Sequence, residues 1–226
     1  NATGEELTGQ VNTYKYCDQV SSAISGIAYN SADALQSITY NNLRQQGAAT
    51  DRDKGEEVAD YTMNYSLKKD VAGTSYIPSE EKTAIVYFYS AAHCRASGAT
   101  EDDAMSQTNS YWYHEGFDPV VVTKDYTTAL QSKAFYVGSK SEEIIDYQMS
   151  YSPYTAGRVL LSVVYQYEGV TPGSLVSATE AQDMSSGLRK VVTCRGDFQD
   201  VQGFLTQLIS IASNNIDMTE YAAFLN

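Results

Sequence analysis

The sequence predicts an α+β fold: a long N-terminal helix packed on a central, mainly antiparallel sheet, with a C-terminal helix. Residues 5–46 contain no proline, and their apolar residues lie three and four positions apart, which is helical spacing. The middle of the chain contains short β-branched and aromatic runs separated by Gly, Pro and Ser, which is typical of strands. Residues 197–211 return to helical spacing and predict the closing helix.

The long helix is predicted from one stripe of apolar and small residues, and Gly47 supplies its stop. Ser31 interrupts the stripe, so we expect the helix to dock along one side of the domain and not to form a strong coiled coil. A second helix is predicted after residues 51–53, and it should end before Gly73. The stripe of the first helix consists of Cys17, Val20, Ile24, Ile27, Ser31, Ala34 and Ile38, widened by Leu35 and Leu43. The second helix would use Val58, Tyr61, Tyr65 and Leu67.

The strands are predicted from β-branched and aromatic runs. Residues 82–89, KTAIVYFY, predict a central buried strand. Thr100, followed by three acids, predicts the capped start of a helix. Residues 181–190 predict another short helix. The remaining strands, which would form an antiparallel meander, are predicted at 119–123, 134–137, 143–150, 158–167, 175–178 and 191–195.

One domain is predicted for residues 1–226, because the chain is long enough for one core and contains no repeat or linker. Within it, residues 1–46 form the long helix, 47–195 the mixed core and 196–226 the C-terminal helices. No apolar run reaches the roughly 20 residues of a membrane span. The chain starts at Asn1 without methionine, so we expect a removed signal peptide or anchor, and membrane contact only through a segment absent from this chain.

The composition indicates an extracytoplasmic protein that does not bind nucleic acid. Fifteen Lys and Arg against 28 Asp and Glu give a formal charge of −13, which repels phosphate backbones. Nineteen tyrosines with few lysines are typical of secreted or surface proteins, which use tyrosine on half-buried faces. The three cysteines form no CxxC pair. Either Cys94 and Cys194 form a bridge, or Cys17, Cys94 and Cys194 are all buried and free.

Catalytic and metal-binding patterns are missing from the sequence, which predicts a protein that is not an enzyme and has no cofactor. It contains no GxSxG, GxxxxGK[ST] or GxGxxG motif. Cys94 is next to His93, but neighbours on a strand point to opposite faces, which disfavours a reactive pair. His114 lies in an aromatic patch, where a surface or pocket-rim histidine is the ordinary explanation. The acids from Asp51 begin like a calcium loop, but Gly55 and Glu56 break the pattern, so we predict no metal site.

Aromatic residues provide the strongest indication of a binding site. Tyr111, Trp112 and Tyr113 precede the middle strands, and Tyr147, Tyr151 and Tyr154 accompany Arg158 further along. Aromatic faces hold alkyl or cationic groups, while Arg binds a carboxylate with two hydrogen bonds, so together these residues predict a small-molecule pocket. Ordinary packing of tyrosines on a sheet face explains the same pattern equally well.

The order of these features resembles the Cache family of extracytoplasmic sensor domains. The resemblance rests on the long first helix, the strand AIVYFY, the pair Trp112-Tyr113 and the segment SPYTAGRVLLSVVYQYEG at 152–169. It implies a PAS-like sheet and a pocket lined by Trp112, Tyr113, Tyr154 and Arg158. Residues 177–180 lack the Asp that amine-binding members place after the late strand, which argues against an amino-acid ligand.

Two functions follow from the sequence. The first is a noncatalytic, extracytoplasmic sensor domain that binds a small molecule and moves its first and last helices. The alternative is a structural subunit of a surface or filament, pilin-like, with a helix before a β head and homo-oligomeric assembly.

Overall fold

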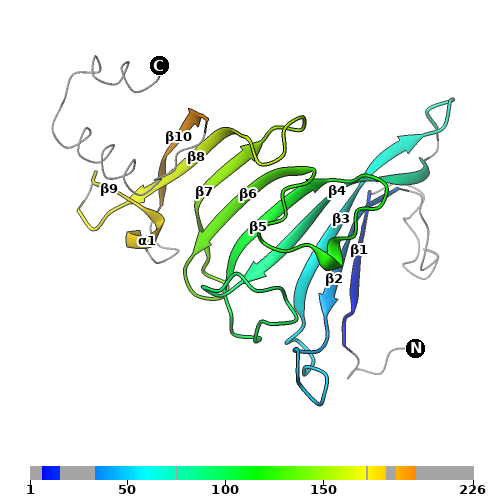
Figure 1. The fold of residues 1–226 in the computed structure, drawn as a ribbon, viewed down its shortest axis with the longest axis horizontal. Helices are drawn as coiled ribbons and strands as arrows, with labels where there is room; N and C mark the ends of the chain where they lie inside the picture. Colours follow the sequence, from blue (N-terminus) through cyan, green and yellow to red (C-terminus); the bar gives the residue numbers. More distant parts are fainter. Residues whose placement is uncertain (1–6, 16–33, 75, 172, 182–186, 197–226) are drawn as a thin grey trace.

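The computed structural model describes residues 7–15, 34–74, 76–171, 173–181 and 187–196. These residues form one antiparallel sheet of ten strands (Figure 1). The described part also contains a 3-10 turn, η3 (Pro119–Val121), and one helical turn, α1 (Ala178–Ala181). The strands are β1 (Gln10–Tyr14), β2 (Leu35–Asn42), β3 (Val58–Lys69), β4 (Tyr76–Tyr89), β5 (Met105–Trp112), β6 (Leu130–Val137), β7 (Ile144–Tyr151), β8 (Val159–Glu168), β9 (Leu175–Val176) and β10 (Leu188–Arg195).

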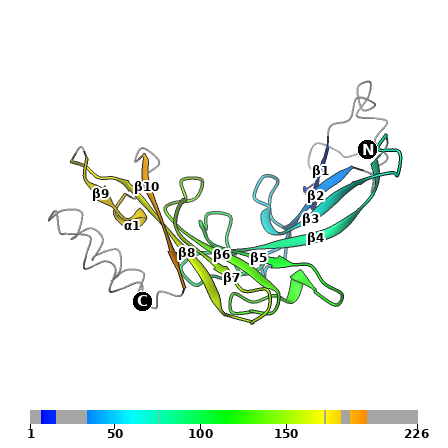
Figure 2. The same cartoon turned by 90° about the horizontal axis from the view of Figure 1, so that it is seen from above.

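The sheet is a meander in which strands β1 to β8 lie side by side in chain order. Strand β10 pairs with β8 and closes the far edge, and the short β9 also pairs with β8. Figure 2 shows that the sheet is bent across its middle, so that β1–β4 and β8–β10 rise on either side of β5–β7. A bend of this kind follows from the right-handed twist of strands and the bulges in most of the ladders.

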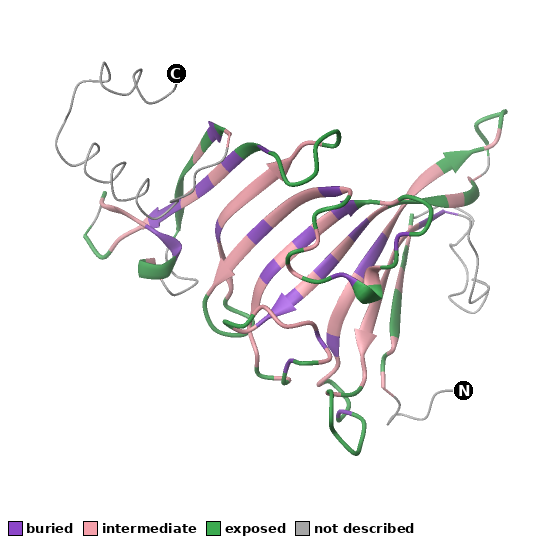
Figure 3. Cartoon of the chain, in the orientation of Figure 1, coloured by how far each residue is buried: buried purple, intermediate pink, exposed green. Residues whose placement is uncertain are grey.

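The main core draws on strands β3–β6, whose buried positions are purple in Figure 3. Its residues lie on one side of the sheet, which we call the core face. Alternation along β4 places Ala84, Val86 and Phe88 on this face, and all three are buried. The connection between β5 and β6 folds over them and adds Phe117 and Val122 to the cluster. A sheet with a single layer can therefore bury apolar side chains, because one long connection serves as the second layer.

A largely buried guanidinium holds that connection against the core face. Arg95 donates from Nη1 to the carbonyl oxygens of Pro119, Val120 and Val122, at 2.9, 3.1 and 2.7 Å. Its Nε donates to Asp60 Oδ1 at 3.0 Å, so one guanidinium joins the sheet to the connection.

A second set of side chains holds the following residues. Asn109 and Lys133 both donate to the carbonyl oxygen of Lys124, and the Tyr111 hydroxyl donates to that of Tyr126. These hydrogen bonds satisfy carbonyl groups of the connection that take no part in sheet pairing, because buried backbone groups need a hydrogen-bonding partner.

The long N-terminal helix predicted for residues 1–46 is wrong, because β1 and β2 lie within this range. The fold is mostly antiparallel β-sheet and not α+β. The residues of β2, LQSITYNN, carry no charge and are rich in Ile, Thr and Tyr, so they suit a half-buried sheet better than a surface helix. The parts of the predicted stripe in residues 16–33 lie outside the described residues, as do all residues but Gly196 of the C-terminal helices predicted for 196–226.

Three further predicted elements are also corrected. The helix expected after residues 51–53 is strand β3, in which Tyr61, Met63 and Tyr65 alternate onto the core face. The expected cap at Thr100 is a turn, in which Asp103 accepts hydrogen bonds from the Thr100 amide and hydroxyl, and strand β5 follows. The strand expected at 119–123 is η3 and coil.

Several predicted strands are confirmed in place. Residues 82–89 lie in β4 and residues 134–137 in β6. The strand predicted at 143–150 matches β7 to within one residue at each end, and the strand predicted at 158–167 matches β8 equally well. Residues 191–195 lie in β10, and residues 175–178 include the short β9. Of the helix expected at 181–190, Ala181 ends α1, residues 182–186 lie outside the described residues, and Leu188 already begins β10, so the predicted end of this helix is wrong. The antiparallel meander was therefore predicted correctly for β6, β7 and β8.

Candidate ligand-binding site

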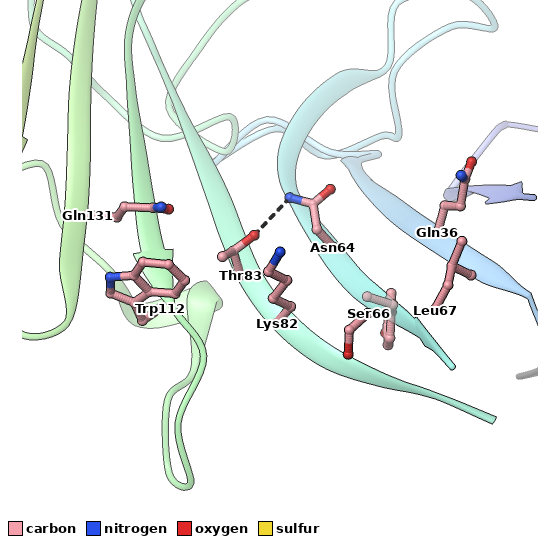
Figure 4. A pocket seen from close by; sticks show the side chains of 9 residues that line it. Gln36, Asn64, Ser66, Leu67, Lys82, Thr83, Trp112 and Gln131 are labelled. Atoms are coloured by element: carbon pink, nitrogen blue, oxygen red, sulfur yellow. Dashed lines mark hydrogen bonds between the residues drawn. The ribbon is translucent and has the colours of Figure 1, made fainter. Parts of the chain in front are cut away.

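A wide, open hollow of about 620 Å³ lies over strands β2–β6 (Figure 4). Trp112 and Gln131 stand at one side of it and Gln36 and Leu67 at the other, with Thr83, Asn64 and Lys82 between them. Its lining combines one indole ring with side-chain amides and hydroxyls. The residues that line it are Gln36, Asn64, Tyr65, Ser66, Leu67, Lys82, Thr83, Trp112 and Gln131.

Sheet register places three lining residues, Asn64, Thr83 and Trp112, in one row. Ser37, which does not line the hollow, pairs with Asn64 and extends the row onto β2, so these four residues of β2–β5 share one face. We call this side of the sheet the polar face. With strands about 4.8 Å apart, the row spans about 14 Å. Asn64 Nδ2 donates to Thr83 Oγ1 at 3.2 Å, which fixes two of its side chains relative to each other.

The polar face continues beside the row as a chain of hydroxyl groups. Thr39 and Thr62 are hydrogen bonded through their Oγ1 atoms at 2.8 Å, and Thr62 Oγ1 also lies 2.9 Å from the Tyr87 hydroxyl. A small cluster of Val58, Tyr89, Ala96 and Ala99 covers the far end of this face, where the β4–β5 connection folds over it. The hollow therefore sits on an ordered polar surface whose other end is closed.

Trp112 is the only tryptophan of the chain, and 39% of its surface is exposed. It ends strand β5, and its amide donates to the carbonyl oxygen of Ala129, which holds the end of the strand against the chain just before β6. An indole ring that is half exposed above a polar surface can cover the apolar side of a ligand while neighbouring groups form hydrogen bonds.

The hollow carries little charge. Lys82 is the only charged side chain among the described residues that line it, and no carboxylate does so. The net charge of −13 disfavours an anionic ligand over the molecule as a whole. The hollow therefore offers mainly neutral hydrogen-bond donors and acceptors, with one ammonium group, beside the rings of Trp112 and Tyr65.

The four residues predicted to line a pocket lie in different places. Trp112 lines the hollow, whereas Tyr113 packs against Phe117 of the core, with ring centroids 6.4 Å apart. A hydrogen bond to the Glu81 carboxylate raises the pKa of Tyr113. Tyr154, which is 95% exposed, and Arg158 lie in the β7–β8 turn and do not line the hollow. A binding role for these three residues stays a prediction.

Sequence reasoning missed Asn64, Thr83 and Gln131, which the structure brings next to Trp112. No motif marks them, because they come from three strands that are separated in the chain. The alternation in TNSYW of β5 indicates only that Ser110 and Trp112 fall on one face and Tyr111 on the other; the residues of the neighbouring strands that lie beside Trp112 are set by register.

The histidine and cysteines form no reactive pair. His93 Nδ1 lies 2.8 Å from Ser106 Oγ, and burial, more than the nearby Lys124, lowers its pKa. The Cys94 thiol donates to the carbonyl oxygen of Tyr89 at 3.4 Å. Cys94 and Cys194 are both free, so the bridge between them is absent, and Cys17 lies outside the described residues.

Carboxylates of the acidic run that begins at Asp51 accept hydrogen bonds from other groups of the protein. Glu57 accepts hydrogen bonds from the amides of Thr8 and Gly55, which lower its pKa, and Arg52 is buried in the middle of the run. Among the residues that the structure describes, no group of three or more His, Cys, Asp and Glu is placed to hold a metal ion.

Within the same residues, no helix combines the length and the apolar character needed to cross a membrane. No protein-family model matches this chain, and neither a curated protein nor a solved structure is significantly similar to it.

Proposed function

We propose that this chain is a noncatalytic, extracytoplasmic binding module that holds a small polar molecule in the hollow on its polar face. The observation that carries the proposal is the row Asn64, Thr83 and Trp112, which the sheet register places side by side beneath an open space. Binding sites combine an apolar surface with a few ordered polar groups, and this row supplies both. The acidic, tyrosine-rich composition supports a place outside the cytoplasm.

The chemistry of the lining supports a role without catalysis. Hydrolysis or group transfer needs a nucleophile, a base and a group that orients the base. The described lining offers amides, hydroxyls, one ammonium group and aromatic rings, with no carboxylate or imidazole beside them. Whether binding is relayed as a signal, as a sensor requires, stays a prediction.

A structural subunit is the second candidate, and the edges of the sheet favour it. Strands β1 and β10 end the described sheet, each with only one neighbouring strand. Strand β10 also exposes Leu188 and Val191. Open edges allow the sheets of two copies to join, and repeated joining would build a filament.

The experiment that tests binding is a thermal-shift screen of sugars, polyols, amines, organic acids, purines and divalent cations. A ligand that binds only the folded state raises the melting temperature in a dose-dependent way. The melting shift should disappear in Trp112→Ala and persist in Leu161→Ala, because Leu161 is 38% exposed but lies on β8, away from the hollow.

Two outcomes decide between the candidates. A ligand whose melting shift depends on Trp112 supports the binding module. No shift with any compound, together with a molar mass that grows with concentration in light scattering, contradicts it and favours the structural subunit.

A further inference from the structure

We infer that the ligand of the hollow is a neutral carbohydrate chain, which lies across strands β3–β6 with one sugar ring on Trp112. This inference rests on the proposed function and adds the chemical class of the ligand. The juxtaposition that carries it is one half-exposed indole ring beside a row of uncharged amides and hydroxyls.

Trp112 matches the apolar side of a sugar. A pyranose ring carries its hydroxyls around the edge and presents C–H groups on its faces, so it stacks on a flat aromatic surface. The indole offers the largest such surface among side chains, and here it is 39% exposed at the side of the hollow. A ligand that covered this surface would remove apolar area from water.

The amides match the hydroxyl groups. A sugar hydroxyl both donates and accepts, and a side-chain amide presents donors and an acceptor side by side. Asn64 uses one N–H on Thr83 Oγ1, so its carbonyl oxygen and a second N–H are left for a ligand. Gln131 stands next to Trp112 in the hollow and makes no side-chain hydrogen bond to another described residue. The hydroxyl groups of a sugar ring stacked on Trp112 would therefore have a hydrogen-bonding partner on each side, Gln131 on one and Asn64 on the other.

Charge and shape argue against anionic and apolar ligands. Nucleotides, organic acids and acidic polysaccharides would enter the field of a chain with net charge −13 and meet only Lys82. A lipid or other apolar ligand prefers an enclosed apolar cavity, whereas this hollow is wide open and lined largely by polar groups.

The length of the row predicts a chain rather than one sugar. Asn64, Thr83, Trp112 and Gln131 line the hollow from four adjacent strands, β3 to β6, over about 14 Å, which is longer than a single pyranose ring. Each added ring would contact a further strand, so affinity should rise with chain length and level off once the row is covered.

The test is native gel electrophoresis of the whole chain through gels that contain a soluble polysaccharide. The acidic protein migrates freely, and binding retards it. The neutral probes are starch, mixed-linkage β-glucan, xylan and galactomannan, and alginate is the anionic control. A retarding polymer is then followed by titration calorimetry with its oligosaccharides of one to six sugars.

The variants separate the hollow from the rest of the surface. We expect retardation by at least one neutral polymer, a loss of affinity of about tenfold or more in Trp112→Ala, and partial retention in Trp112→Tyr, which keeps an aromatic face. Asn64→Ala should weaken binding less. Leu161→Ala should bind like the wild type, because its side chain is as exposed as Trp112 but lies elsewhere.

Each adverse result has its own meaning. Binding of neutral polymers that is equal in wild type and Trp112→Ala overturns this location for the site. Retardation by alginate alone overturns the neutral class. No retardation by any polymer, with a Trp112-dependent melting shift from another compound, overturns the carbohydrate and leaves the proposed function standing. No binding of any kind overturns both.

Discussion

Replacing Arg95 by alanine should destabilise the fold strongly, because this guanidinium joins strand β3 to the connection that covers the core. It lies 2.8 Å from Asp60 through Nη2, and its Nη1 donates to three carbonyl oxygens of the η3 segment. Only 15% of the Arg95 side chain and 19% of the Asp60 side chain are exposed. Alanine would leave a carboxylate and three carbonyl groups in a largely buried place without their donor.

The magnitude follows from these contacts. Removing one member of a buried ion pair costs roughly 3–5 kcal/mol. Water can reach part of this site, so we expect Arg95→Ala to lower the free energy of unfolding by about 3 kcal/mol, at the lower end of that range. This is roughly a hundredfold change in the unfolding equilibrium constant. Lysine keeps the charge but cannot present the planar fork, so Arg95→Lys should lose about 1–2 kcal/mol.

The assay is urea unfolding followed by the fluorescence of the single tryptophan, Trp112. The matched control is Arg44→Ala, because Arg44 pairs with Asp51 at 2.6 Å but both side chains are more than half exposed. That exposed pair should contribute less than about 1 kcal/mol. If Arg95→Ala loses no more stability than Arg44→Ala, the connection is not held by this guanidinium, and the reasoning fails.

Three further predictions concern buried ionisable groups. Burial raises the pKa of the Asp146 carboxyl above its value in the unfolded chain, so its ionisation lowers the free energy of unfolding as pH rises through the raised pKa. Asp146→Asn removes this ionisation, so the stability of the variant relative to wild type should increase between about pH 3 and pH 7. A stability difference that does not change with pH would contradict this. Burial raises the pKa of Tyr111 from 10.0 to about 12, so stability should fall between these two pH values, and Tyr111→Phe should reduce that fall in alkaline unfolding curves. Cys194 is buried and its thiol pKa is raised, so iodoacetamide should modify it slowly until urea is added, as peptide mass spectrometry would show; rapid native labelling would refute its burial.

The sequence was sufficient for strands whose residues are mostly β-branched or aromatic and was misleading where they are polar. The apolar residues of 82–89 do not follow helical spacing, so this part of β4 was predicted correctly as a strand. In β3, Val58, Tyr61 and Tyr65 fall at helical spacing, yet Tyr61, Met63 and Tyr65 also alternate. A short run of mixed polarity satisfies both periods, and the sheet decides between them through the partners that it supplies.

The candidate site was predictable only in part, because a row across strands is set by register. Trp112 is identifiable as the only tryptophan within an aromatic cluster. Asn64 and Thr83 become its neighbours through two ladders, and the ladder between β3 and β4 shifts register directly after Asn64. One such shift moves every following side chain to another partner, so the row could not be read from spacing along the chain.

The chain order of the strands has a consequence for how the molecule folds. From β1 to β8, every ladder joins two strands that are consecutive in the sequence, so pairing closes only one connection at a time. Each closure costs little chain entropy, and the low contact order should make folding fast for an all-β protein. During synthesis, each new strand can join an edge that already exists, without waiting for the C-terminal residues to leave the ribosome.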